Sequence, residues 1–252
     1  MPSFLINFTE NTAEIEVFDD EFHHIVNVFR HKKGDVLPLI NGNGLKAKGQ
    51  IQEIMKKSLK MKIEEIIQVA KPSYKVACAF TLLKQKHDLL IVEKLTELGV
   101  DDLFPMQTKN SVKQSSENTL EKYKKTAISA AKQCNNAWLP KIHEVSDLSV
   151  VLDVLKVNDY FPIIASELIP ISTLNFFLTT DASDKKEPHN RSIFANKTNV
   201  CIIIGPEGGF AQSEFELFEK LDIKQVSISK NILRAETAAI CAISQIMGMY
   251  NG

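Results

Sequence analysis

Three nearly continuous apolar runs constrain the fold of this chain most strongly: KVACAFTLL (75–83), YFPIIASE (160–167) and NVCIIIG (199–205). Runs without polar alternation are typical of strands that a parallel sheet buries on both faces. Segments with helical spacing separate them, and the first, 88–100, contains Gly99 as a stop signal. Strands that alternate with helices predict an α/β domain with a mainly parallel sheet.

The rest of this region continues the alternation of strands and helices. Further strands are predicted at 102–107 and 225–229, and further helices at 120–138, 146–156 and 235–250. Ser146 or Asp147 is the expected N-cap of the helix at 146–156. The polar, turn-rich segment 181–199 is predicted to be a mobile surface loop.

The first 71 residues have a different pattern. Apolar and polar residues alternate at 13–18 and 58–66, as they do in strands with one buried face. VLPLI (36–40) precedes NGNG (41–44), which is a strong turn signal. With one short helix around 20–30, this region is predicted to be a small, mostly antiparallel barrel or sandwich.

Lys71-Pro72 separates the two patterns, and we expect one domain at 1–71 and a second at 72–252. The formal net charge of the whole chain is −1, yet nine basic and only two acidic residues lie between Arg30 and Lys62. This local excess suits a polyanion such as RNA. The solvated outer face of a barrel is the simpler alternative.

The composition indicates a globular protein, with 44% apolar and 24% charged residues. The start, MPSFLINFTE, lacks the basic and apolar regions of a signal peptide, and no stretch approaches the roughly 20 apolar residues of a membrane span. The four cysteines, at 78, 134, 201 and 241, form no CxxC pair, so we expect buried free thiols. We therefore expect a cytoplasmic protein without a membrane segment or a metal site.

A glycine-rich loop, GPEGGF, follows the apolar run at 199–205. Ligands of open α/β sheets bind at such strand ends, and Ser213 with Glu216 predicts a capping box in the next helix. The loop has neither the GK[ST] ending of a P-loop nor the GxGxxG pattern of a dinucleotide site, and Glu207 would repel a phosphate. It therefore suits a neutral or cationic ligand, unless it is only a tight turn.

A second strand, loop and helix follow as QVSIS, KNILR and AETAAI. Arg234 immediately precedes the helix, where a cation opposes the helix dipole. A purely structural helix would more naturally begin with an acid or a capping residue. We therefore expect Arg234 to act on a ligand or to pair with a carboxylate, Glu207 or Glu236.

IGPEGGF followed by ILRAETAAI resembles the signature pair of the SPOUT class of RNA methyltransferases, in particular of the ribosomal RNA small-subunit methyltransferase E family. Three further segments resemble motifs of this family, in the family's order: HHIVNVFRHKKGD (23–35), EKLTELGV (93–100) and AAKQCNNAWLP (130–140). Two positions depart from the pattern. Ser229 stands where a glycine is usual, and Asn136 stands where the family often has a basic residue.

The resemblance implies a SPOUT-type α/β domain with a C-terminal trefoil knot, preceded by a PUA-like β-barrel that helps to grip RNA. It implies a homodimer that uses S-adenosylmethionine to methylate N3 of a uridine in the 16S rRNA of the 30S subunit. A non-catalytic RNA-binding protein that retains the fold is the alternative. An α/β enzyme that uses a nucleotide such as NAD is a third hypothesis, which the loop chemistry disfavours.

The resemblance also implies roles for individual residues. The cofactor-binding residues would be Ala165, Ser166, Glu167, Ile204, Gly205, Pro206, Glu207, Gly208, Gly209, Ile228, Ser229, Asn231, Ile232, Leu233 and Thr237. The candidates for RNA contacts are Arg30, Lys32, Lys84, Lys86 and Lys109. Arg234 would stabilise charge on the uracil ring or hold the RNA. Glu236 or Glu207 would accept the N3 proton, unless Glu236 only orients Arg234 through an ion pair.

Overall fold

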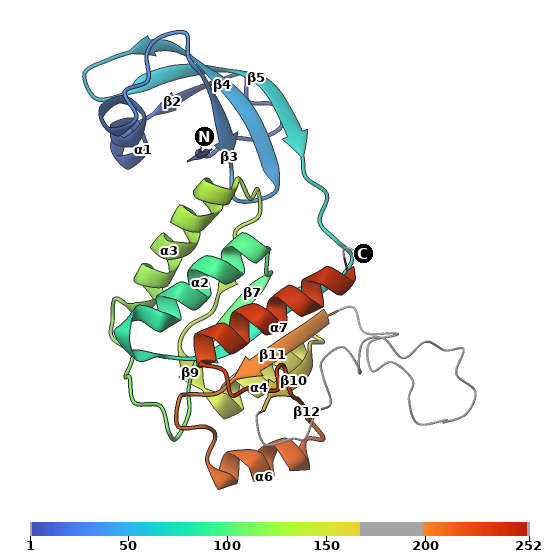
Figure 1. Cartoon of the computed structure of the whole chain (residues 1–252). Helices are drawn as coiled ribbons and strands as arrows, with labels where there is room; N and C mark the ends of the chain where they lie inside the picture. Colours follow the sequence, from blue (N-terminus) through green and yellow to red (C-terminus); the bar gives the residue numbers. More distant parts are fainter. Residues whose placement is uncertain (1, 167–198, 251–252) are drawn as a thin grey trace. The chain divides into compact units, whose positions relative to one another are not determined.

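The computed structural model describes residues 2–166 and 199–250 (Figure 1). The predicted mobile loop at 181–199, apart from Asn199, lies outside the described residues. The predicted site residue Glu167 also lies outside them.

The chain divides into two compact units, Met1–Lys71 with Ala127–Leu139 and Pro72–Thr126 with Pro140–Gly252. The segment Ala127–Leu139, which was expected in the second domain, thus groups with the N-terminal unit.

The N-terminal unit is built on a five-stranded sheet. Its strands are β1 (Phe4–Leu5), β2 (Glu14–Val17), β3 (Val36–Ile40), β4 (Leu45–Ile54) and β5 (Leu59–Gln68). They pair in the order β1-β3-β4-β5-β2, antiparallel except for β1 with β3. The predicted short helix consists of an α-helix, α1 (Asp19–His23), and a π-helical turn (His24–Val28). The predicted strands and the mostly antiparallel pairing are confirmed.

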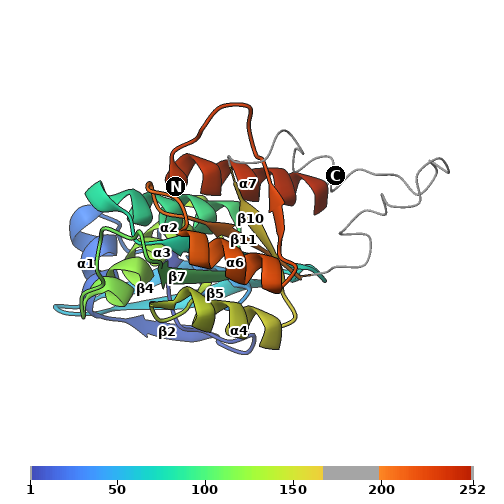
Figure 2. The same cartoon turned by 90° about the horizontal axis from the view of Figure 1, so that it is seen from below.

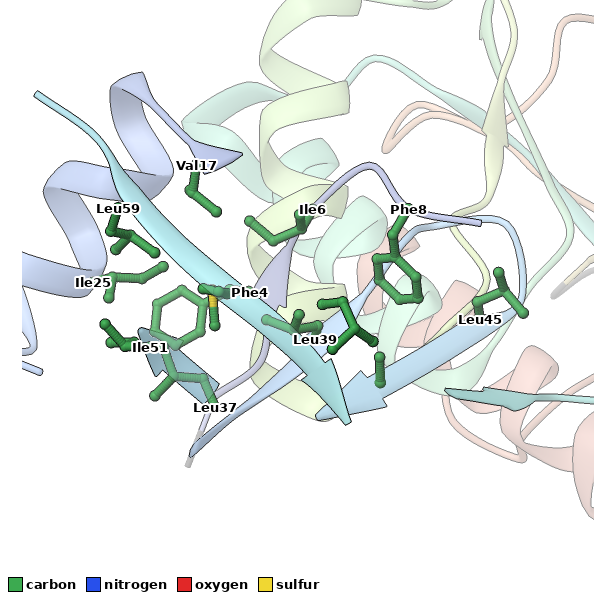
Figure 3. Packing of buried hydrophobic residues seen from close by; sticks show 13 residues of the cluster. Phe4, Ile6, Phe8, Val17, Ile25, Leu37, Leu39, Leu45, Ile51 and Leu59 are labelled. Atoms are coloured by element: carbon green, nitrogen blue, oxygen red, sulfur yellow. The ribbon is translucent and has the colours of Figure 1, made fainter. Parts of the chain in front are cut away.

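Strand alternation builds the core of this unit. In β5, Leu59, Met61 and Ile63 are buried, whereas Lys60 and Lys62 are exposed, as the pattern predicted. The same cluster contains Phe4, Ile6, Phe8, Val17, Ile25, Leu37, Leu39 and Ile51 (Figure 3). Each large apolar side chain buried in this way contributes about 1.5–3 kcal/mol relative to exposure.

The helix α3 (Thr119–Cys134) is shorter than predicted. It ends because Asn135 adopts a left-handed φ of 57°. The side chain of Asn136 then accepts the N–H of Trp138 at 3.0 Å, which closes a turn where the sequence predicted helix.

The second unit is built on a parallel sheet. Its strands are β6 (Lys75–Thr81), β7 (Asp102–Gln107), β8 (Lys141–Ile142), β9 (Ser146–Asp147), β10 (Phe161–Ala165), β11 (Asn199–Ile204) and β12 (Lys224–Val226). Their order is β12-β10-β11-β6-β7-β8, β9 also pairs with β7, and every described pair is parallel. This confirms the predicted α/β class, although β12 ends at Val226 instead of continuing to 229.

Helices cover both faces of this sheet. Besides α3, the α-helices described for this unit are α2 (His87–Leu98), α4 (Leu148–Val157), α6 (Gln212–Lys220) and α7 (Ala235–Tyr250). α7 packs on β6 and β11 and against α2, whereas α4 and α6 lie on the other face (Figure 2). There Leu152 and Phe218 join one buried cluster. α2 ends before Gly99, whose φ of 83° confirms the predicted stop.

One of two predicted helix starts is confirmed. Asp147 is the N-cap residue of α4, although its side chain makes no capping hydrogen bond. The capping box predicted for Ser213 and Glu216 is wrong, because α6 begins two residues earlier than that box requires. The acid that reaches back is Glu214, which accepts the N–H of Ala211 at 2.8 Å.

Within the described ranges, no helix has both the length and the apolar character of a membrane span. The same residues contain no group of three or more His, Cys, Asp or Glu that could hold a metal ion. Within the described residues, none of the four cysteines forms a disulfide. Cys78 and Cys201 are buried, as predicted, and burial raises the pKa of both thiols. Cys241 is half-buried, and Cys134 is exposed at the last turn of α3, contrary to the prediction.

Candidate active site

The carboxyl ends of β10, β11 and β12 lie side by side, because the three strands are parallel neighbours. The described residues at and after these strand ends line a first cavity of about 310 Å³. Its wall includes nine predicted cofactor residues: Ala165, Ser166, Ile204, Gly205, Pro206, Glu207, Gly209, Ile232 and Leu233. A smaller recess of about 50 Å³ shares part of this wall and is lined further by Ile228, Ser229 and Asn231.

Gly208 and Thr237, also predicted to bind the cofactor, are not in the wall of these spaces. The wall instead includes Phe210, which the sequence analysis did not single out. A Cβ atom added to Gly205 would lie 2.9 Å from the ring of Phe210, so this glycine permits close aromatic packing. Gly209 has a φ of 69°, a conformation that favours glycine.

A loop after β7 braces the glycine loop. Asn110 donates its Nδ2–H to the carbonyl of Gly209 at 3.0 Å. The backbone N–H of Lys109 donates to Glu214 Oε1 at 2.9 Å, and Lys109 Nζ donates to Ser213 Oγ at 2.6 Å. The glycine loop is therefore held by residues from a distant part of the sequence.

Ser229, which replaces the usual glycine, causes no left-handed strain, because its φ is not positive. Its Oγ accepts the N–H of Asn231 at 3.1 Å, and its carbonyl accepts the hydroxyl of Ser227 at 3.0 Å. These two hydrogen bonds hold the loop in its conformation, which a serine at position 229 can therefore adopt.

Glu236 lies in the first turn of α7 and is 8% exposed. A carboxylate is favourable there because of the helix dipole. Its Oε1 lies 2.7 Å from Nδ1 of His87, the first residue of α2, although the two groups are not aligned as a hydrogen bond. Arg234 is exposed and forms no ion pair with another described residue. Glu236 therefore pairs with His87, and the hypothesis that it only orients Arg234 is not supported.

A second cavity of about 300 Å³ lies beside this pair. Its lining residues are Lys84, Gln85, His87, Glu207, Arg234 and Glu236. Glu207 and Arg234 also line the first cavity, so the two spaces meet at these two side chains. The first cavity is bounded mainly by backbone and apolar groups, and the second mainly by charged and polar ones.

The predicted RNA contacts are placed in both units. Lys84 lines the second cavity, and Lys86 is exposed at the N-cap of α2. Lys109 is engaged with Ser213 at the start of α6. In the N-terminal unit, Arg30 and Lys32 are exposed.

These features agree with two family models. A model of an RNA methyltransferase domain matches residues 69–247, and a model of an RNA methyltransferase PUA domain matches residues 19–64. The chain is therefore an RNA methyltransferase with an N-terminal PUA domain.

Similar proteins specify the family. Ribosomal RNA small subunit methyltransferase E of Rickettsia conorii is 31% identical over 242 residues, which cover 94% of this chain and 90% of that protein. The protein of the same name from Bacillus subtilis is 27% identical over 255 residues, which cover 98% and 96%. The chain belongs to the ribosomal RNA small subunit methyltransferase E family, and the resemblance of its motifs is confirmed.

Solved structures share the fold. A probable rRNA-methyltransferase from Porphyromonas gingivalis matches with a TM-score of 0.72 and 27% identity, over 94% of this chain and 93% of that one. A ribosomal RNA small subunit methyltransferase E from Neisseria gonorrhoeae, solved with S-adenosyl methionine, matches with a TM-score of 0.79 and 18% identity, over 98% and 97%. At this identity the second match concerns the fold alone.

Proposed function

We propose that this RNA methyltransferase transfers the methyl group of S-adenosylmethionine to N3 of a uridine in the 16S rRNA of the small ribosomal subunit. The observation that carries the proposal is the meeting of two cavities at Glu207 and Arg234. One cavity suits a donor without phosphate, and the other suits a nucleobase. The names of the relatives support ribosomal RNA of the small subunit as the substrate.

The first cavity fits S-adenosylmethionine by its chemistry. Backbone groups at Gly205 and Gly209 suit ribose hydroxyls and an adenine edge, and Ile204 and Leu233 supply apolar surface. Glu207 is compatible with a sulfonium and an amine, whereas it would repel a phosphate. When bound, S-adenosylmethionine supplies the methyl group. The other residues proposed to hold it are Ala165, Ser166, Glu167, Pro206, Gly208, Ile228, Ser229, Asn231, Ile232 and Thr237.

The acceptor nitrogen must lose its proton. N3 of uridine is an imide nitrogen that normally pairs with adenine, so the protein must flip the base or choose an unpaired one. Arg234 lines both cavities and is available to stabilise negative charge on O2 or O4 of the ring. Two carboxylates lie at the same place, Glu207 exposed and Glu236 buried against His87.

We further infer a C-terminal trefoil knot of the SPOUT type, a cytoplasmic homodimer and action on the 30S subunit. Motif resemblance to the family supports these inferences. In this account residues 1–71 form the PUA-like β-barrel that grips RNA, with Arg30 and Lys32 on its surface. Residues 72–252 form the methyltransferase domain, which contacts RNA through Lys84, Lys86 and Lys109.

Titration calorimetry tests the donor site directly. Saturable binding of S-adenosylmethionine to the folded protein is expected, and a folded protein that binds none contradicts the proposal. Measuring methyl transfer to 30S subunits in parallel separates the alternative function. A non-catalytic RNA-binding protein would bind the subunits without transferring a methyl group.

A further inference from the structure

His87 and Glu236 form a histidine–carboxylate pair in the wall of the second cavity. Their side chains are 26% and 10% exposed, and Nδ1 of His87 is buried against Glu236 Oε1. The remaining ring nitrogen, Nε2, is therefore the one available to a ligand. The pair lies beside Arg234 and Glu207, where the two cavities meet.

We propose that Nε2 of His87 accepts the N3 proton of the target uridine and that Glu236 is the residue that positions His87. This inference rests on the proposed function and deepens it by naming the proton acceptor. The negative charge of Glu236, whose Oε1 lies 2.7 Å from Nδ1, favours a proton on that nitrogen, leaves Nε2 to act as a base and stabilises the imidazolium that forms.

The step balances without a further reactant. The N3–H bond breaks and its proton goes to Nε2, while the electron pair left on N3 forms the bond to the methyl carbon. The sulfur–methyl bond breaks, and its electron pair stays on sulfur, which becomes a neutral thioether. The proton on His87 then returns to water, because the second cavity is open to solvent at its exposed residues.

The two carboxylates are weaker candidates for the same role. Glu207 is exposed, and Glu236 is nearly buried and turned toward the imidazole. An imidazole is a stronger base than a carboxylate and changes charge nearer to neutral pH, where a general base works best. Besides these two carboxylates, the charged groups near His87 are Lys84, Lys86, Arg234 and Asp88, the last of which is paired with Lys113.

The backbone before His87 supports a functional role. Gln85 and Lys86 have φ values of 54° and 67°, so two successive residues that are not glycine take left-handed conformations. Such conformations are costly and concentrate at functional sites. Here they end one helical turn and begin α2, so that His87 faces the first turn of α7. The strained residues therefore lie immediately before His87 and help to place its ring beside Glu236.

Single-turnover methyl transfer to 30S subunits, with donor and subunits saturating, tests this proposal on the full-length protein. His87→Ala should slow transfer by about 10²–10⁴-fold, the usual contribution of a general base. Its affinity for S-adenosylmethionine should remain that of the wild type in calorimetry. Added imidazole should restore part of the rate, more strongly as the pH rises and the free imidazole loses its proton.

A matched control exists at the opposite edge of the sheet. His143 Nε2 lies 2.7 Å from Oδ1 of Asp102 at the start of β7, so it is another, half-buried histidine–carboxylate pair. Added imidazole should not raise the rate of methyl transfer by His143→Ala, even if this substitution lowers stability as much as His87→Ala does. His87→Gln serves as the second variant if His87→Ala fails to fold, and it should slow transfer to a similar extent.

The possible outcomes distinguish a failure of the role of His87 from a failure of the proposed function. An active wild type with an equally active His87→Ala variant overturns the role of His87 alone. So does a slow His87→Ala variant whose rate added imidazole does not raise at any pH. A wild type that binds 30S subunits and donor but transfers nothing overturns the proposed function, and this inference with it.

Discussion

Glu214 accepts the backbone N–H of Lys109 at 2.9 Å, across 105 positions of sequence. Its other oxygen accepts the N–H of Ala211 at 2.8 Å, and the residue is only 7% exposed. One buried carboxylate thus ties the loop after β7 to the start of α6. Because α6 follows the glycine loop directly, the shape of the first cavity depends on this side chain.

Glu214→Ala should destabilise the protein by about 3 kcal/mol, because it leaves two enclosed N–H groups without an acceptor. Urea unfolding measures this change. Glu216→Ala is the matched control, since Glu216 is exposed on the same helix and should change stability by less than about 0.5 kcal/mol. Equal effects of the two substitutions would show that Glu214 does not brace the loop.

Gly205→Ala should weaken binding of S-adenosylmethionine about tenfold, because the new Cβ meets the Phe210 ring at 2.9 Å and displaces a wall of the first cavity. Titration calorimetry measures the affinity. Gly248→Ala provides the contrast, since nothing lies within 4 Å of its Cβ position in α7. That substitution should leave the affinity unchanged and stabilise the helix by about 0.5–1 kcal/mol. Unchanged binding in Gly205→Ala would contradict the assignment of this wall.

Arg234→Ala should lower the rate of methyl transfer by about 10²–10³-fold, because it removes the cation beside the charge that develops on the ring. Most of the donor affinity should remain, since the contacts proposed for the donor are largely with backbone groups. Single-turnover kinetics and calorimetry distinguish the two effects. Lys230→Ala, an exposed neighbour in the same loop, should retain full transfer. A wild-type rate in Arg234→Ala would show that Arg234 takes no part in methyl transfer.

Asp102 contributes to stability in a pH-dependent way. Burial by itself raises the pKa of this carboxyl, but hydrogen bonds with His143 (2.7 Å) and Tyr160 (2.6 Å) outweigh it and hold the pKa below its usual value. A lowered pKa adds stability above the unfolded-state value of about 3.9, and this is lost as the pH falls through the folded-state value.

Asp102→Asn should therefore flatten the dependence of the unfolding free energy on pH below about pH 4. Urea unfolding over an acidic pH series measures the slope. Asp153→Asn, an exposed carboxylate on α4, should leave the slope as in the wild type. A wild-type slope in Asp102→Asn would mean that the bonds to His143 and Tyr160 add nothing at acidic pH.

The fold class could be predicted because its signals are local. Apolar runs such as 199–205 predict buried strands, and Gly99 predicts the end of α2. The glycine loop could be placed at a strand end for the same reason. Helix limits near Asn135 and Ala211 were missed, because they depend on a single backbone angle and on which acid reaches a free N–H.

The pairing of His87 with Glu236 could not be predicted from the sequence. His87 reaches Glu236 only because α2 and α7 pack together and because Gln85 and Lys86 take left-handed conformations. Neither residue is a glycine, so the turn leaves no sequence signal. An ion pair with Arg234, which is near in sequence, was one alternative that the sequence left open for Glu236, whereas its partner in the structure, His87, is near only in space.

Transfer of a radiolabelled methyl group from S-adenosylmethionine to 30S subunits, followed by digestion and mapping of the labelled nucleoside, tests the central claim most directly. The account predicts label in N3-methyluridine at a single position of the 16S rRNA, and none with His87→Ala on the same timescale. Absence of label, or label on a ribose oxygen or on another base, would contradict it.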